Sequence, residues 1–220
     1  MAEQAIRALL SGHPDILWGF ADTAWSPYAA QYPTALVMAV PYGEQLTPED
    51  YNEARFDAGI RAAKARIEAI LPQIEEILTA HEIRCWIPPV AQRDEAELLA
   101  PFPFKTAAAR AGLGWFGKND VIITLRYGPR VRLSAMLIDA VFTPGTPIVQ
   151  SECPDDCTAC VDACPCKALK NHQWTVDTDR SEMIDYQRCN RMRSAFIPKL
   201  GRKSACGLCL TVCPVGRQSL

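Results

Sequence analysis

The stretch Cys157-Thr-Ala-Cys160-Val-Asp-Ala-Cys164-Pro165 decides the fold of the carboxy-terminal part of the chain. The same pattern returns 49 residues later as Cys206-Gly-Leu-Cys209-Leu-Thr-Val-Cys213-Pro214, with every cysteine and the proline in register. Three thiolates on one tight loop can occupy corners of an iron–sulfur cube, and the cysteine before the proline reaches the other cube of a pair. The repeat therefore predicts a small domain built around two 4Fe-4S clusters.

Each half of the repeat needs one further upstream thiolate, and Cys153 and Cys189 are available. The predicted ligands of the first cluster are Cys153, Cys157, Cys160 and Cys213. Those of the second cluster are Cys164, Cys189, Cys206 and Cys209. The segment from Cys153 to Cys157 is one residue longer than the usual first loop, so a 3Fe-4S cluster is the alternative for this half.

A pair of zinc sites is the main alternative to clusters, because zinc held by four cysteines also uses the Cys-x2-Cys spacing. Zinc ribbons require neither the third cysteine nor the Cys-Pro ending, so we favour iron and sulfur. We interpret Cys166 as a spare small residue at a helix start and Cys85 as part of a strand core. Nine of the ten cysteines fall in the last 68 residues at metal-ligand spacings, which indicates a reducing compartment rather than a disulfide scaffold.

The net charge of the chain does not identify a binding partner. The 220 residues carry a formal net charge of -2, which gives no general attraction to nucleic acid or anionic membranes. The amino terminus lacks a secretory signal, and no run approaches the ~18 apolar residues of a membrane span, so we predict a cytoplasmic protein with no membrane partner. The basic stretch from Arg188 to Lys203 could receive RNA phosphates or an acidic electron carrier, but anionic clusters also favour nearby cations, and we prefer that interpretation.

The first half of the chain reads as alternating helix and strand. Apolar residues between Phe56 and Leu78 recur at three- and four-residue steps, which predicts a long amphipathic helix that Pro72 should kink or divide. Thr47-Pro48-Glu49-Asp50 has the order of residues that a helix start prefers. The other predicted elements are a helix over 3–10 and strands over 16–20, 35–40, 83–87, 121–125 and 131–138, the last two joined around Tyr127-Gly128-Pro129.

A linker rich in proline, glycine and threonine, Phe142-Thr-Pro-Gly-Thr-Pro-Ile148, precedes an abrupt change of composition toward Cys, Asp, Arg and Lys. We therefore place a domain boundary there. The predicted fold class is α+β, with an α+β domain over residues 1–148 and a cluster-binding domain over residues 149–220.

The densest motif of the first domain runs from Lys105 through Gly112-Leu113-Gly114-Trp115-Phe116-Gly117-Lys118 to Asn119. Three glycines beside a tryptophan let the backbone approach a large flat ligand, while the indole face and Lys118 contact it. Gly-x-Gly also closes helices, and tryptophan is commonly a core residue, so loop closure is the alternative. The motif is not a dinucleotide fingerprint, which needs Gly-x-Gly-x-x-Gly after a strand.

The chain resembles the epoxyqueuosine reductase-like family, whose members are cobalamin-dependent iron–sulfur enzymes related to reductive dehalogenases. The resemblance begins near residue 100, runs to the end of the chain and includes the double-cluster tail. It implies a corrinoid-binding α/β sandwich domain, nitroreductase-like, followed by a small two-cluster domain like bacterial ferredoxin. Its motifs are Ala111-Gly-Leu-Gly-Trp-Phe-Gly-Lys-Asn119, Ile122-Ile-Thr124, Tyr127-Gly128, Arg130-Val-Arg132-Leu133 and Asp139.

The resemblance also implies the chemistry. The nearer cluster would reduce the cobalt of a bound corrinoid to Co(I), which could remove oxygen or halogen from a substrate, while the other cluster takes electrons from a ferredoxin or flavodoxin. Carried over by position, the residues lining the corrinoid would be Gly114, Trp115, Gly117, Lys118 and Asn119, with Lys105, Arg130 and Arg132 near its amide and phosphate groups.

Two features depart from the family pattern. The apolar Leu98-Leu99-Ala100 stands where the family has a proton-donating aspartate, which leaves Tyr127, Glu97 and Lys105 as the candidates for a catalytic acid. The chain also stops six residues after Pro214, whereas the tRNA-modifying enzymes continue into helical repeats. We therefore rank tRNA below a small-molecule or nucleoside substrate.

Two hypotheses follow from these features. The first is an oxidoreductase that passes electrons through two 4Fe-4S clusters to a bound cobalamin for reductive deoxygenation or dehalogenation. The second, which the absent acid favours, is an electron-transfer module that reduces or reactivates a partner corrinoid protein without a substrate of its own. A flavin in the first domain ranks below both, because no phosphate-binding loop is evident.

Overall fold

The computed structural model describes residues 1–89, 98–195, 197–201 and 206–217. The chain mixes helices and short strands, as the α+β prediction requires, and forms two compact units. The first unit comprises Met1–Pro41, Ala63–Leu113 and Arg132–Ile148. The second comprises Tyr42–Ala62, Gly114–Val131 and Val149–Leu220. One junction therefore lies at residue 148, but two earlier segments belong with the cysteine-rich part of the chain.

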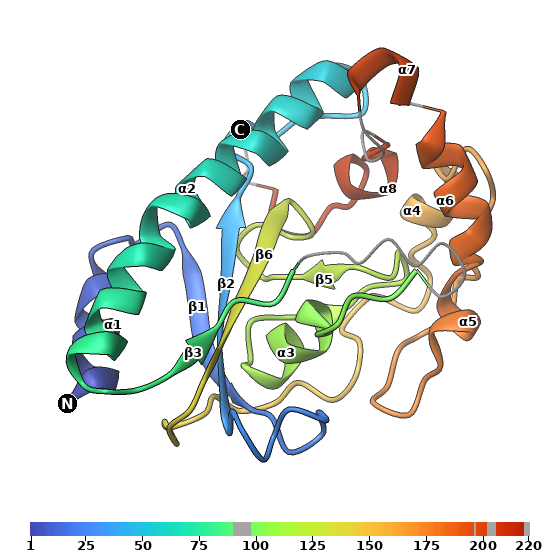
Figure 1. Ribbon diagram of the computed structural model, residues 1–220. Coiled ribbons are helices and arrows are strands. Elements are labelled where there is room, and N and C mark those ends of the chain that lie inside the picture. The colour runs from blue at the N-terminus through green and yellow to red at the C-terminus, as the bar shows by residue number, and fades with distance from the viewer. Residues whose placement is uncertain (90–97, 196, 202–205, 218–220) are drawn as a thin grey trace. The chain divides into compact units, whose positions relative to one another are not determined.

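A four-stranded sheet forms the centre of the first unit (Figure 1). Its order is β1 (Leu17–Asp22), β2 (Thr34–Pro41), β6 (Val131–Ile138) and β3 (Cys85–Trp86). The pair β1 and β2 is antiparallel with Leu17 opposite Ala39, and β3 and β6 are antiparallel with Cys85 opposite Ile138. Strands β2 and β6 are neighbours in the sheet but are not consecutive in the chain, so a crossover connects them.

Helices lie on both sides of this sheet. Helix α3 (Phe104–Arg110) packs on β1 and β2. In Figure 1, α1 (Ala2–Ser11) and helix α2 (Glu53–Ala80) lie on the other side of the sheet from α3. A sheet covered on both faces needs apolar residues at every position of its inner strands, and seven of the eight residues of β2 are buried.

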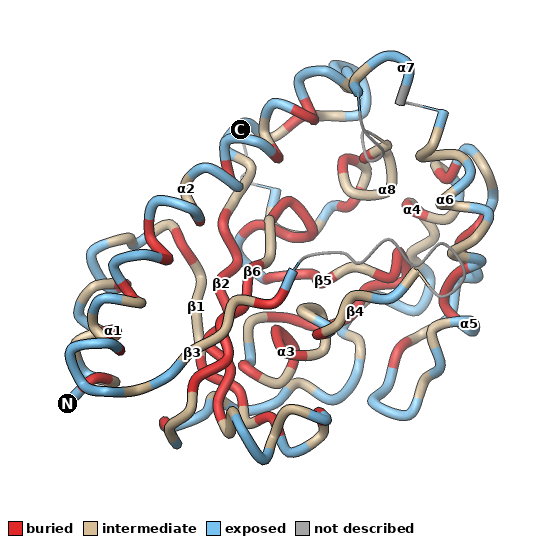
Figure 2. Tube along the Cα trace, in the orientation of Figure 1, coloured by how far each residue is buried: buried red, intermediate tan, exposed pale blue. Residues whose placement is uncertain are grey.

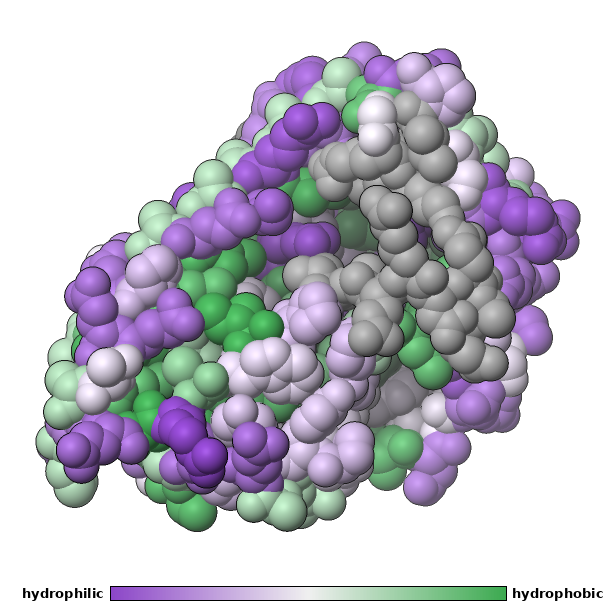
Figure 3. Space-filling view, viewed as in Figure 1, coloured by the Kyte–Doolittle hydropathy of each residue, from purple (hydrophilic) through white to green (hydrophobic). Residues whose placement is uncertain are grey.

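Burial follows the apolar pattern of the sequence (Figure 2). The buried positions of α2 in the first unit are Ala63, Ile67, Ile70, Leu71, Ile74 and Leu78. They recur at helical spacing, and each large one contributes about 1.5–3 kcal/mol when fully removed from water. Hydrophilic residues line α2 on the face seen in Figure 3. The long helix therefore gains its stability from one apolar stripe.

Most predicted elements of the first unit are confirmed, with changes at their ends. The helix over 3–10 and the strands over 16–20, 35–40 and 131–138 correspond to α1, β1, β2 and β6. The strand over 83–87 is reduced to the two residues of β3. Pro72 does not divide α2, which continues as one helix of 28 residues.

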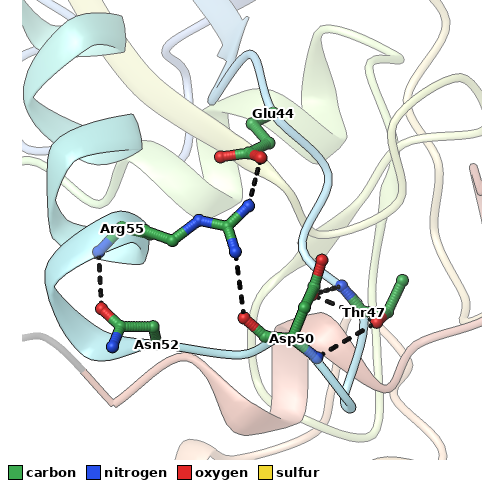
Figure 4. A network of polar contacts seen from close by, with 5 residues as sticks. All are labelled: Glu44, Thr47, Asp50, Asn52 and Arg55. Atoms are coloured by element: carbon green, nitrogen blue, oxygen red, sulfur yellow. Dashed lines mark hydrogen bonds and ion pairs between the residues drawn. The ribbon is translucent and has the colours of Figure 1, made fainter.

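The predicted start of α2 is wrong by several residues (Figure 4). The backbone N–H and hydroxyl of Thr47 both donate to the Asp50 carboxylate, so this segment closes on itself as a turn. The cap is Asn52, whose Oδ1 accepts from the N–H groups of Ala54 at 3.0 Å and Arg55 at 3.1 Å. The side-chain oxygens of asparagine and threonine can both accept from the first N–H groups of a helix. The local turn at Thr47 decides that Asn52 is the residue that caps α2.

The second unit has little regular structure. A two-stranded antiparallel sheet pairs β4 (Trp115–Phe116) with β5 (Ile122–Ile123). The predicted strand over 121–125 is thus shortened, and it pairs with β4 rather than with β6 across the turn at Gly128. The helices of this unit after residue 148 are α4 (Ala159–Asp162), α5 (Arg180–Met183), α6 (Tyr186–Ser194), α7 (Ile197–Leu200) and α8 (Leu208–Thr211).

A small apolar cluster supports α8 in the second unit. Leu46, Phe56 and Ile60 form its buried centre, and Leu210 of α8 packs against it with Tyr42 and Tyr51. The start of α2 therefore belongs to the cysteine-rich unit through packing. Across the described ranges of the chain, no helix combines the length and apolar character needed to cross a membrane.

We predict that Asn52→Ala lowers the free energy of unfolding by about 1 kcal/mol, because two N–H groups at the start of α2 lose their acceptor. Thr47→Ala is the matched control and should cost less than about 0.5 kcal/mol, because Thr47 caps no helix. Urea unfolding of both variants measures the difference. A larger loss for the threonine variant would contradict this assignment of the cap.

Candidate metal centre

The sequence repeat is also a structural repeat. Helices α4 and α8 each have four residues and begin one residue after Thr158 and Gly207, respectively. The N–H of Asp162 donates to the carbonyl of Thr158 at 2.9 Å, and the N–H of Thr211 donates to Gly207 at 2.9 Å. The two helices also contact each other. Each therefore presents its central cysteine, Cys160 or Cys209, at the same position of one helical turn.

Four thiols influence one another around the first half of the repeat. Burial, followed by the neighbouring thiols of Cys213, Cys153 and Cys157, raises the pKa of Cys160 to about 12. Burial also raises the pKa of Cys213, and Cys153 and Cys157 add to this effect. These are the four residues predicted to hold the first cluster. The residue from the second motif, Cys213, lies within the electrostatic reach of the first motif.

The remaining four predicted ligands form a second such group. Burial raises the pKa of Cys209 well above its ordinary value, and the thiols of Cys206 and Cys189 add to this. Burial also raises the pKa of Cys189, with further contributions from Cys206 and Cys164. Cys164 of the first motif thus joins the cysteines of the second. Cys160 of the first set also acts to raise the pKa of Cys209, so the two sets lie within electrostatic reach of each other, and the crosswise assignment of ligands stays a prediction.

Cys166 contacts the second group through Cys164. Their sulfur atoms are 3.7 Å apart. Burial and the Cys164 side chain raise the pKa of Cys166 to about 11. Burial also acts to raise the pKa of Cys164, but the Ala168 N–H and Cys166 outweigh it and lower that pKa. Cys164 is therefore the better anionic ligand, and Cys85 lies in β3 of the other unit.

The chemistry of these groups follows from their repulsion. A buried thiolate is unfavourable, and neighbouring thiolates make it more so, unless a cationic centre is bound. No cluster of three or more His, Cys, Asp or Glu side chains in the described residues could hold a single metal ion. Four sulfurs around one zinc ion lie about 4 Å apart, whereas the ligands of a cube bind separate iron atoms. That the two thiol groups hold iron–sulfur clusters stays a prediction.

Lys118 of the central motif is buried, with 3% of its surface exposed. Its ammonium donates to the carbonyl oxygens of Pro154 at 3.1 Å, Asp155 at 2.8 Å and Cys157 at 3.0 Å. All three acceptors lie in the segment between Cys153 and Cys157 that is one residue longer than usual. Lys118 therefore holds this loop in place.

Asn119 and Arg130 make the corresponding contacts to the second motif. The Asn119 amide donates to the Cys209 carbonyl at 3.1 Å. Arg130 is 4% exposed, and its Nη1 donates to the carbonyls of Leu210 at 3.2 Å and Cys213 at 3.0 Å. Burial lowers the pKa of Arg130. These donors therefore satisfy main-chain carbonyls that flank predicted cluster ligands.

The glycines of the motif have structural partners as well. A Cβ on Gly114 would collide with the Ile123 carbonyl across the β4–β5 pair, and one on Gly117 would lie 2.6 Å from the Ile123 side chain. Trp115 is buried, and its indole Nε1 has no hydrogen-bond partner among the described residues. The indole N–H is therefore a buried donor without an acceptor among the described residues.

The other predicted site residues are placed as follows. Lys105 and Arg132 belong to the first unit, whereas the motif residues from Gly114 to Asn119 belong to the second. Tyr127 is buried, with the Arg126 guanidinium 5.0 Å from its ring centre. Glu97 falls outside the described residues. Corrinoid contacts and a catalytic role for these residues stay predictions.

Several contacts that support the cysteine loops have no signal in the sequence. The Gln173 side chain donates to the Cys153 carbonyl at 2.7 Å and to Asp155 at 3.0 Å. The Tyr51 hydroxyl accepts from the Gly207 N–H at 2.9 Å. Burial raises the pKa of Tyr51 to about 12, so this hydroxyl is neutral near pH 7. No spacing or motif marks such residues, because their partners are backbone groups.

The basic stretch from Arg188 to Lys203 begins on α6. The Arg193 guanidinium acts to lower the pKa of Cys189 and Cys206 against the effect of burial. A cation near the second thiol group agrees with the preferred interpretation of this stretch. Arg202 and Lys203 fall outside the described residues.

No family model matches the chain. Curated relatives do match its sequence. The epoxyqueuosine reductase of Bacillus subtilis strain 168 is 36% identical over 114 residues, which is 51% of this chain and 29% of the relative. That of Bacillus anthracis is 34% identical over 111 residues, 50% of this chain and 28% of the relative. The match thus spans under a third of the length of these relatives.

Solved structures match almost the whole chain. A structure of Bacillus subtilis epoxyqueuosine reductase, with its catalytic aspartate loop swung out of the active site, has a TM-score of 0.63 at 20% identity, covering 99% of this chain and 66% of its own. An epoxyqueuosine reductase with an epoxyqueuosine-modified tRNA stem loop also has a TM-score of 0.63 at 20% identity, and the match covers 98% of this chain and 66% of that reductase. A catabolic reductive dehalogenase has a TM-score of 0.68 at 21% identity, and the match covers 98% of this chain and 32% of the dehalogenase. These findings confirm the family resemblance and the mixed α and β fold.

We predict that Gly207→Ala lowers the free energy of unfolding by at least about 2 kcal/mol, because its Cβ would collide with the Phe56 ring at the start of α8. The cost should fall in a Phe56→Leu background, where the ring is absent. A double-mutant cycle in urea therefore yields a favourable coupling energy. Additive effects of the two substitutions would contradict the contact.

Proposed function

We propose that this chain, which resembles the epoxyqueuosine reductase-like family, is an iron–sulfur oxidoreductase that passes electrons through two 4Fe-4S clusters to a bound corrinoid. The supporting observation is the pair of four-thiol groups, each taking one cysteine from the other motif. Such an exchange places two one-electron centres within one small unit. The relatives that match half of the chain are named as reductases, which agrees with this proposal.

The corrinoid part rests on fewer residues. When bound, a corrinoid supplies a reductant strong enough to cleave carbon–oxygen or carbon–halogen bonds. The Trp115 indole N–H, which has no acceptor among the described residues, suits an acceptor on such a large ligand. A reductive dehalogenase among the structural neighbours is described by a B12-dependent mechanism. The role of the chain's own residues would be to hold the ligand and to exclude water around it.

The source of a proton separates the enzyme from an electron-transfer module. The segment Leu98-Leu99-Ala100, where the family has its aspartate, carries no acid, and Leu99 is 54% exposed. Tyr127 and Lys105 remain the described candidates for a proton donor. Without a donor in place, the chain would serve as a module that reduces or reactivates a partner corrinoid protein. This is the second candidate function.

The substrate and the electron donor are the remaining parts of the proposal. A neighbouring structure holds an epoxyqueuosine-modified tRNA stem loop, and this chain covers 66% of that neighbour. We propose a small-molecule or nucleoside substrate before tRNA, and a ferredoxin or flavodoxin as the electron donor. Residues 1–148 and 149–220 stay our proposed corrinoid and ferredoxin-like domains, and a cytoplasmic location stays a prediction.

We predict that protein prepared without oxygen is brown and holds about eight iron atoms per chain, because two cubes of four irons are bound. Cys209→Ser should lose about half of this iron, since one cube loses a ligand. After incubation with cobalamin and desalting, about one cobalt atom should remain per chain. Iron and cobalt are measured by elemental analysis. Colourless protein with zinc would contradict the cluster proposal, and bound flavin would contradict the corrinoid.

We predict that the dithionite-reduced, corrinoid-loaded protein releases halide from a bromophenol, or deoxygenates an epoxide-bearing nucleoside, at least tenfold faster than the Cys209→Ser variant. In the proposed pathway, electrons pass through both clusters before they reach the corrinoid. The loss of one cluster therefore interrupts electron transfer. Ion chromatography and mass spectrometry measure the two products. If the clusters are reduced but no product forms, while a separate corrinoid protein is reduced, the chain is the electron-transfer module.

A further inference from the structure

Two buried cations lie against the loops of the first thiol group. Lys118 has three carbonyl acceptors at 2.8–3.1 Å, in Pro154, Asp155 and Cys157. A neutral amine has only two protons to donate, so three acceptors at this distance fit the charged ammonium. A full positive charge is therefore buried beside the loop that connects Cys153 to Cys157.

The second cation reaches the same thiol group from the other motif. Arg130 donates to the carbonyl of Cys213, the ligand that the second motif contributes to the first group. Its charge acts to lower the pKa of that thiol, against the effect of burial. Both Lys118 and Arg130 are at least nine-tenths buried, so water screens their charges weakly. The first group thus has two cations on its loops.

The second thiol group has different surroundings. Arg193 acts to lower the pKa of Cys189 and Cys206, but Asp120 acts to raise the first of these and Glu53 to raise the second. Arg193 is only partly buried. The side chain of the central motif that reaches this group, Asn119, is neutral. Among the described residues, the buried positive charge is therefore greater at the first group, whose loop acids Asp155 and Asp156 are exposed to water.

We infer that Lys118 and Arg130 are positioning residues for the first cluster and make it the easier of the two to reduce. The inference rests on the proposed function, because it requires both clusters. A cube that accepts one electron gains one negative charge, and nearby buried cations stabilise that reduced form. An electron from a low-potential one-electron donor then resides on the first cluster, held by Cys153, Cys157, Cys160 and Cys213, in preference to the second.

The test is a potentiometric titration of the anaerobic protein, with electron paramagnetic resonance as the readout and dithionite as the reductant. Cys157→Ser and Cys206→Ser identify the signal of each cluster, because each replaces a predicted ligand of one cluster only. In the wild type, the signal that Cys157→Ser alters should be reduced at the higher potential.

Lys118→Met removes the charge and keeps a side chain of similar length. The equilibrium constant for reducing the first cluster should fall about tenfold, which is a shift of about 59 mV to lower potential for one electron. The second cluster should not shift, and Arg130→Met should act on the same cluster as Lys118→Met. Arg193→Met is the matched control and should shift the second cluster alone. Lys118→Arg, which retains the charge, should restore the potential.

Several outcomes would overturn the inference. They are equal shifts of both clusters, no shift in Lys118→Met and Arg130→Met, or a wild type in which the second cluster is reduced first. If Lys118→Met fails to retain iron, the shift in Arg130→Met and the order in which the two wild-type clusters are reduced still test the inference. A wild type without iron would remove the proposed function together with this inference, whereas intact clusters without a selective shift would remove the inference alone.

Discussion

The mutual repulsion of buried thiolates is the constraint on which the second unit depends. Burial alone raises the pKa of thiols, and each group of four adds the negative charge of its neighbours. Near pH 7 such thiols are neutral, and they ionise only around a strongly positive centre, which the proposed cube of iron ions would supply. If Cys164 and Cys213 each bind the cluster of the other motif, as proposed, the two halves of the repeat must fold together.

Main-chain carbonyls create a second electrostatic requirement. Tight cysteine loops turn many carbonyl oxygens away from regular hydrogen bonds, and a buried carbonyl without a donor is costly. Lys118, Asn119 and Arg130 supply these donors from a segment that precedes the acceptor residues by 36–90 positions along the chain. This explains why residues 114–131 belong to the cysteine-rich unit. The motif that suggested a ligand site also supports the cluster loops.

Sequence patterns predicted some elements well because their cause is repeated along the chain. The apolar stripe of α2 and the continuous burial of β2 extend over many residues, so single exceptions such as Pro72 do not obscure them. The start of α2 was predicted at Thr47 because its local residues favour a cap. Asn52 offers an equivalent oxygen, and only the turn that joins Thr47 to Asp50 excludes the earlier start. Short strands such as β3 and β5 are limited by pairing, which the sequence does not encode locally.

The sequence by itself determined the repeated cysteine motif, since cysteine spacing and its repetition in register are visible in one dimension. It also determined the mixed helix and strand pattern and the family resemblance. Only the tertiary structure decided what Lys118, Asn119 and Arg130 contact, and that Tyr51 and Phe56 support α8. The physical reason is that their partners are backbone carbonyls, N–H groups or apolar surface far away in the chain. Every residue carries such groups, so no side-chain pattern identifies which of them a distant cation or ring will meet.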